Sequence, residues 1–172
     1  MSAQLRGPPE PAESTFLHPM TTAHLDAVMA IEASAYAFPW TRGNFIDSLA
    51  AGYPARVLVG TRGVVFGYFI AMAGVEEMHL LNITVAPAAQ GRGHARTLMA
   101  ALTALCREHM AAELWLEVRA SNAHARSIYE RMGFVSAGHR KGYYPAAFGR
   151  REDALVMRLR LDAPAGGGHA LE

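Results

Sequence analysis

The sequence predicts an α+β fold built on one mixed β-sheet of about seven strands, flanked by about four helices. Some segments have apolar residues at helical spacing, and others are runs of β-branched and aromatic residues. Turn residues separate these runs. One long helical stretch, 90–110, lies between two such runs, 78–85 and 114–118. A helix that crosses over between two strands lets them run parallel, whereas short turns produce antiparallel pairs. The sheet is therefore expected to be mixed.

Length and composition indicate one globular domain. The chain has 172 residues, of which 51% are hydrophobic, and a formal net charge of +1. We expect one domain over residues 15–161, with flexible tails at 1–14, which is proline-rich, and 162–172, which is glycine-rich. Basic residues are dispersed, and no stretch has the pattern of a membrane span or a signal peptide. We therefore expect a cytoplasmic protein that binds neither nucleic acid nor membrane; its oligomeric state is not predicted.

The first half of the chain is expected to contain a strand, two helices and three strands. Thr21 or Thr22 can cap the first helix. A second helix is predicted over 41–52, and Pro39 separates the two because proline forces the preceding residue out of helical geometry. Three β-branched and aromatic runs then predict an antiparallel meander over 55–60, 64–73 and 78–85.

The second half is expected to contain the long helix, a strand, a short helix and two strands. Leu114, Leu116 and Val118 alternate as in a strand with one buried face. Ser121 or Asn122 caps a short helix that ends at a glycine, a residue suited to the left-handed turn that closes helices. The last two strands are predicted at 134–139 and 154–161.

The loop before the long helix holds two glycines, at positions 91 and 93. A nucleotide-triphosphate loop needs Gly-Lys before Ser or Thr, and the only lysine, Lys141, is not in such a motif. A dinucleotide loop needs a third small residue where this chain has Arg96, and it opens a βαβ unit. Two interpretations stay open. The glycines serve turn geometry alone, or successive N–H groups at the helix start hold a pyrophosphate such as that of coenzyme A.

This loop and four other stretches resemble the Gcn5-related N-acetyltransferases (GNAT), whose pyrophosphate loop is Gln/Arg-x-x-Gly-x-Gly/Ala. The similarity extends to the RimI-type branch, which acetylates bacterial ribosomal proteins. It implies the GNAT fold and transfer of acetyl from acetyl-CoA to a protein N-terminal α-amino group, with the N-terminal alanine of the eighteenth small-subunit ribosomal protein as acceptor. The four stretches are "AIEASAYAFPW" (30–40), "NITV" (82–85), "LWLEVRASNAHARSIYERMGF" (114–134) and "GYYP" with "REDALVM" (142–145, 151–157).

The resemblance assigns roles to residues that are ambiguous on their own. Glu117 lies on the opposite strand face from its apolar neighbours, as a solvated glutamate would, and the resemblance implies a general base. Tyr129 has the spacing of a packed aromatic residue, and the resemblance implies a general acid for the coenzyme A thiolate. Asn122 is expected to cap a helix and to contact the coenzyme. An α-amino group has a pKa of roughly 8, against about 10.4 for lysine, so a carboxylate suffices as its base.

The remaining expected sites are main-chain groups, loop residues and aromatic side chains. A sheet edge at Ile83, Thr84 and Val85 is expected to pair with the pantetheine arm, with the Val85 N–H nearest the thioester oxygen. The pyrophosphate is expected at Gln90, Gly91, Arg92, Gly93, His94, Ala95 and Arg96. Trp40, Tyr143 and Tyr144 either line the acceptor side or serve packing.

Other features limit the prediction. The eight histidines show no metal-binding spacing, and the single cysteine, Cys106, is expected to be an inert core thiol. The chain lacks the acidic residue that the resemblance implies near Ala86, and its loop 146–150 is one residue longer and less polar. Acceptor choice therefore stays open among this ribosomal protein, other protein N-termini, lysine side chains and small amines. A non-catalytic coenzyme A-binding regulator is the alternative from another class.

Overall fold

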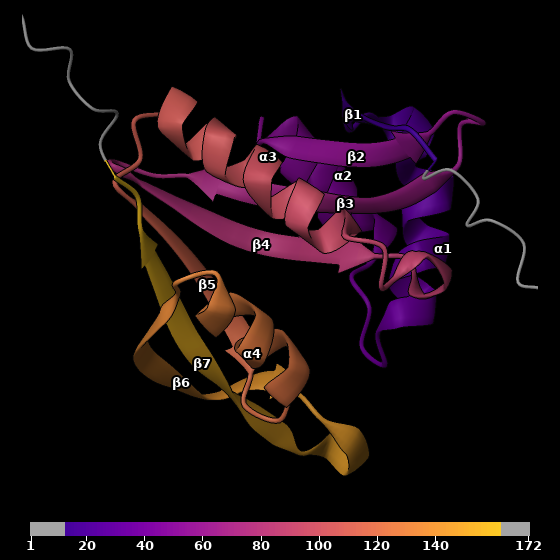
Figure 1. The fold of residues 1–172 in the computed structure, drawn as a ribbon. Helices are drawn as coiled ribbons and strands as arrows, with labels where there is room; N and C mark the ends of the chain where they lie inside the picture. Colours follow the sequence, from indigo (N-terminus) through magenta and orange to yellow (C-terminus); the bar gives the residue numbers. More distant parts are fainter. Residues whose placement is uncertain (1–12, 163–172) are drawn as a thin grey trace, which may run out of the picture.

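The computed structural model describes residues 13–162, so the predicted tails lie outside the described part except for residues 13, 14 and 162. A seven-stranded mixed sheet and four helices confirm the predicted fold (Figure 1). The strands are β1 (Thr15–Pro19), β2 (Ala55–Gly60), β3 (Val65–Ala73), β4 (Glu77–Val85), β5 (Glu113–Arg119), β6 (Val135–Pro145) and β7 (Arg151–Arg160). The helices are α1 (Leu25–Ala35), α2 (Arg42–Ala50), α3 (His94–Glu108) and α4 (Ala123–Arg131).

The sheet opens between its two central strands. Its strand order is β1-β2-β3-β4-β5-β7-β6, and only β4 and β5 pair in parallel. That pairing covers just Glu77–Leu80 against Glu113–Leu116. The register of β4 with β3 shifts at Leu81, which has no partner opposite, and such a bulge bends a strand. Figure 1 shows β4 and β5 leaving a common end and diverging, so the last residues of β4 are not paired with β5.

Two apolar layers cover the sheet. On one face, α3 buries Leu98 and Leu102 together with Phe69 of β3. On the other face, α1 packs against Tyr68, the neighbour of Phe69, because successive strand residues point to opposite faces. Burial raises the pKa of the Cys106 thiol to about 11, which suits the inert core residue that the sequence predicts. Within residues 13–162, no helix combines the length and apolar character that a bilayer span requires.

Several predicted boundaries are corrected. The long helix begins at His94 and not at residue 90, because Gly91 and Gly93 adopt left-handed φ values of 76° and 83°. The last two strands are longer than predicted, since β6 reaches Pro145 and β7 starts at Arg151. Their added residues lack apolar alternation, and the register slips between residues 140 and 144. Arg151 donates hydrogen bonds to the main chain of β6, which holds this end of the hairpin together.

Gly67 offers a test of how β3 meets the end of β4. A Cβ atom at this position would lie 2.7 Å from the Thr84 carbonyl oxygen and 3.3 Å from the Val85 Cα atom. Gly67→Ala is therefore expected to lower the free energy of unfolding by about 1–3 kcal/mol, as overpacking does, in urea titrations. Gly138→Ala is the matched control, since nothing lies within 4 Å of its added Cβ. Equal stability of the two variants would contradict the close approach of β3 and β4.

Candidate active site

A cavity of about 710 Å³ lies at the opening between β4 and β5. Its walls come from α1 and the segment after it, from β4, β5 and α4, and from the loop between β6 and β7. The predicted site residues that line it are Trp40, Ile83, Glu117, Asn122, Tyr129 and Tyr144. Residues predicted from five separate segments thus reach one cavity, whereas Thr84, Val85, Tyr143 and the glycine loop lie outside its lining.

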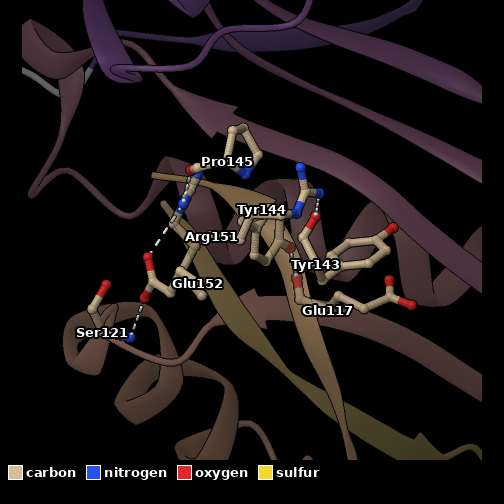
Figure 2. Close-up of polar contacts among 8 residues, drawn as sticks. Glu117, Ser121, Tyr143, Tyr144, Pro145, Arg151 and Glu152 are labelled. Carbon is tan, nitrogen blue, oxygen red and sulfur yellow. Dashed lines mark hydrogen bonds and ion pairs between the residues drawn. The ribbon is translucent and has the colours of Figure 1, made fainter. Parts of the chain in front are cut away.

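Glu117 projects into this cavity from β5. Residues 114, 116 and 118 are buried on the opposite face, as the alternation predicts. The Glu117 side chain is 17% exposed, and its Oε1 atom lies 3.5 Å from the Arg140 Nε atom. Its main-chain carbonyl accepts a hydrogen bond from the Tyr144 hydroxyl at 3.1 Å (Figure 2). The carboxylate is therefore accessible from the cavity while its backbone is anchored to β6.

Tyr129 supplies a phenol from α4. Burial, followed by the proximity of Tyr36 and Tyr144, raises the pKa of Tyr129 above the ordinary value of 10.0. Its ring packs against Phe134, with 5.6 Å between the ring centroids. A phenol that keeps its proton at neutral pH can donate that proton to a leaving group. The structure thus brings the Glu117 carboxylate and the protonated Tyr129 phenol to the same cavity.

Arg119 organises the wall beside Glu117. It lies two residues along β5 from Glu117 and so on the same strand face, a signal that the sequence analysis missed. Its Nη1 atom donates to the Pro145 carbonyl at 2.8 Å and to Glu152 at 3.2 Å. Its guanidinium carbon lies 4.5 Å from the centroid of the Tyr144 ring. Arg119 therefore ties β5 to the ends of β6 and β7.

Glu152 completes this wall. Its carboxylate accepts a hydrogen bond from the Ser121 N–H at 2.7 Å (Figure 2). It also accepts the bond from Arg119. Hydrogen bonding by Ser121, and then by the Arg119 guanidinium, lowers the pKa of Glu152 below its ordinary value of 4.5. Sequence reasoning did not single out Glu152, because its partners lie about thirty residues away.

The three predicted acceptor-side aromatic residues lie in different places. Trp40 lines the cavity and also packs on Phe45, with 5.3 Å between ring centroids. Tyr144 lines the cavity, whereas Tyr143 is 41% exposed and stacks edge-on against Tyr144 outside the lining. The loop 146–150, which is one residue longer than the resemblance implies, borders the cavity through residues 146 and 147.

The glycine loop has the donor pattern that a diphosphate requires. Among the described residues, none accepts a main-chain hydrogen bond from the N–H groups of residues 91–96. A Cβ atom at Gly91 or Gly93 would meet nothing within 4 Å, so the space above the loop is open. These N–H groups also lie at the positive end of α3. The loop therefore fits the diphosphate of coenzyme A.

The end of β4 offers a partly free sheet edge. The Ala86 N–H bonds to β3, and main-chain groups alternate in direction along a strand. Those of Thr84 consequently point to β3, while those of Ile83 and Val85 point into the opening. The Val85 carbonyl accepts a hydrogen bond from the Gln90 side chain at 3.3 Å. Ile83 and Val85 can thus pair with an extended ligand, whereas the main-chain groups of Thr84 are used in the pairing with β3.

Asn122 has the structural role that its position predicts. Its side-chain oxygen accepts the N–H of Ala125 at 3.1 Å, which makes it the N-cap of α4. It also lines the cavity. The side-chain NH₂ group of Asn122, which the cap does not use, is therefore a candidate contact for a bound coenzyme.

Comparison with known proteins relates this chain to a family. The model of the acetyltransferase (GNAT) family matches residues 25–134. The chain is 38% identical over 142 residues to the [ribosomal protein bS18]-alanine N-acetyltransferase of Escherichia coli strain K12, covering 83% of this chain and 95% of that protein. The Haemophilus influenzae protein of the same name is 36% identical over 131 residues, covering 76% and 88%.

A solved structure agrees with these sequence relatives. The crystal structure of the ribosomal-protein-S18-alanine N-acetyltransferase from Escherichia coli superimposes with a TM-score of 0.80 at 35% identity. The match covers 92% of this chain and 99% of that one. Nearly the whole described fold is therefore shared.

The lowered pKa of Glu152 predicts a pH-dependent contribution to stability. A carboxyl group with a depressed folded-state pKa stabilises the fold above pH 4.5, and this contribution is lost as pH falls through the lower folded value. Glu152→Gln is therefore expected to lower Tm at pH 7, with a difference from the parent that narrows below pH 4.5, in calorimetric scans. The exposed Glu130→Gln is the control, and a Tm difference for Glu152→Gln that widens in acid would contradict the ion pair.

Proposed function

Because the chain belongs to the acetyltransferase (GNAT) family, we propose that it transfers the acetyl group of acetyl-CoA to the N-terminal alanine of ribosomal protein bS18. The observation that carries the proposal is the cavity that places Glu117 and Tyr129 together at the opening of the sheet. The names of the relatives support the choice of acceptor. We propose the cytoplasm as the location, because ribosomal proteins are made there.

The donor would be held by main-chain groups. Acetyl-CoA supplies an acetyl thioester at the end of an extended pantetheine arm. The free N–H groups of residues 91–96 would hold its diphosphate, with Arg92 and Arg96 adding positive charge. The edges of Ile83 and Val85 would pair with the amides of the arm as an additional strand does. This path leads from the start of α3 into the cavity, where the Val85 N–H would hydrogen-bond the thioester oxygen.

Proton transfers would be divided between two side chains. Glu117 would take a proton from the α-ammonium group, directly or through water. The free amine then forms the new C–N bond as the C–S bond breaks, and the Tyr129 hydroxyl protonates the departing sulfur. The second proton that the acylated nitrogen loses would restore the Tyr129 hydroxyl through solvent, and the proton on Glu117 would return to solvent. Since an α-amino group has a pKa of roughly 8, about a tenth is already uncharged at neutral pH. A carboxylate base is therefore better suited to an N-terminal amine as acceptor than to a lysine side chain as acceptor.

A peptide assay tests the proposed acceptor. Incubation with acetyl-CoA should add an acetyl group to peptides that begin Ala-Arg-Tyr and not to N-blocked peptides that contain lysine, as measured by mass spectrometry. Acetylation of the blocked peptides, of other N-termini in preference, or of small amines would overturn this acceptor and favour one of those substrate classes. Failure to release thiol with any amine would favour a non-catalytic regulator that binds coenzyme A.

The role of Glu117 predicts a specific pH profile. Glu117→Gln should lower turnover about a hundredfold at pH 7, with a smaller effect above pH 8, where more of the amine is already uncharged. The affinity for acetyl-CoA, measured by calorimetry, should stay within about twofold of the parent value, because main-chain groups hold the donor in this proposal. A twofold change corresponds to less than about 0.5 kcal/mol of binding free energy. The exposed Glu108→Gln serves as control. Equal turnover of the Glu117 variant and the parent at pH 7 would remove Glu117 from the mechanism.

A further inference from the structure

Glu32 is a buried carboxylate that the proposed mechanism does not use. It lies in α1, is 1% exposed, and sits at the inner end of the cavity lining. Three groups donate to it: the Trp40 N–H at 2.8 Å, the Asn82 side-chain amide at 3.1 Å and the Tyr68 hydroxyl. Because these bonds compensate the lost hydration of the carboxylate, Glu32 is stable in the core.

The carboxylate sets the direction of a hydrogen-bonded chain. Since the Asn82 amide nitrogen donates to Glu32, its oxygen faces Thr84 and accepts the Thr84 hydroxyl proton at 2.9 Å. Thr84 has one hydroxyl proton, so the Tyr36 hydroxyl must be the donor in its 2.8 Å contact with Thr84. The Ile83 carbonyl, at 3.1 Å, is another acceptor for the same Tyr36 proton.

The chain leaves the Tyr36 oxygen as an acceptor at the cavity. Its only proton is used by Thr84 and Ile83, and none of residues 13–162 is seen to donate to this oxygen. Tyr36 lines the cavity, as Glu117 does, and the residue is 39% exposed. Burial of the hydroxyl raises the pKa of Tyr36, so its proton is retained at neutral pH.

We propose that the Tyr36 oxygen accepts a hydrogen bond from an N–H of the acceptor amine, and that Glu32, Asn82 and Thr84 are positioning residues that direct the Tyr36 proton away from the acceptor. The inference rests on the proposed function and adds a specificity element to it. An ammonium group has only N–H donors at the reacting nitrogen, and a neutral amine can donate one N–H to Tyr36 while its lone pair stays available to attack the thioester. The arrangement therefore selects an amine and orients it toward the thioester.

The first test removes the oxygen and keeps the ring. Tyr36→Phe should raise KM for an Ala-Arg-Tyr peptide about tenfold, the value of one well-placed hydrogen bond, with a smaller change in kcat. The Kd of the peptide, measured by calorimetry with coenzyme A present, should rise by the same factor, and that of acetyl-CoA should not change. Tyr53→Phe is the matched control, because Tyr53 lies outside the cavity lining.

The second test asks whether Thr84 acts through Tyr36. Thr84→Val keeps the shape and breaks the chain, and it should raise KM about threefold, whereas Thr84→Ser should restore the parent value. In the Tyr36→Phe background, Thr84→Val should have no further effect, because the group that it positions is gone. Additive effects would show a merely structural Thr84 and overturn the positioning part of the proposal.

The outcomes separate this inference from the proposed function. If the parent protein acetylates no N-terminal peptide, the proposed function fails, and this inference fails with it. If the parent is active and Tyr36→Phe has parental KM and peptide Kd, only the inference is overturned. Tm measurements on each variant distinguish lost binding from lost folding, and a variant with parental Tm and raised KM supports the proposal.

Discussion

The parallel pairing of β4 with β5 ends after four residues on each strand, and the candidate site lies where it ends. Leu81 has no partner in β3, and the resulting bulge bends β4 away from β5 at the next step of the chain. Main-chain groups that a continuous sheet would pair are left facing an opening, and buried polar groups of that kind require a partner. A sheet that fails to close between two central strands therefore creates both a cavity and an edge for an extended ligand.

Two of the three carboxylates that line this cavity, Glu117 and Glu32, have different surroundings. Glu117 is partly exposed and has one arginine nearby, at 3.5 Å. Glu32 is enclosed and accepts three hydrogen bonds. Environment assigns different tasks to similar groups in this way. The partly exposed carboxylate of Glu117 can be reached from the cavity, whereas that of Glu32 is occupied by its three hydrogen-bond donors.

The opposite wall depends on an arginine that joins three strands. Arg119 of β5 contacts Pro145, Tyr144 and Glu152, which belong to β6 and β7. Glu152 in turn holds the N–H of Ser121, just before α4. The β6–β7 hairpin, which borders the cavity, is therefore connected to the strand and helix that carry Glu117 and Tyr129. A change in the conformation of the loop 146–150 would therefore shift Pro145 and Glu152, the two residues to which Arg119 donates.

The sequence by itself determined the order of the elements, the glycine loop, a cap at Ser121 or Asn122 and the strand face of Glu117. These depend on local spacing, such as the alternation around Leu116, and local spacing is written in the chain. The tertiary structure alone decided that Glu32 meets Asn82, that Arg119 meets Glu152, and that Tyr144 and not Tyr143 lines the cavity. These outcomes depend on strand register, on the bulge at Leu81 and on the close of the β6–β7 hairpin. Periodicity along one segment carries no information on how far another segment is shifted beside it.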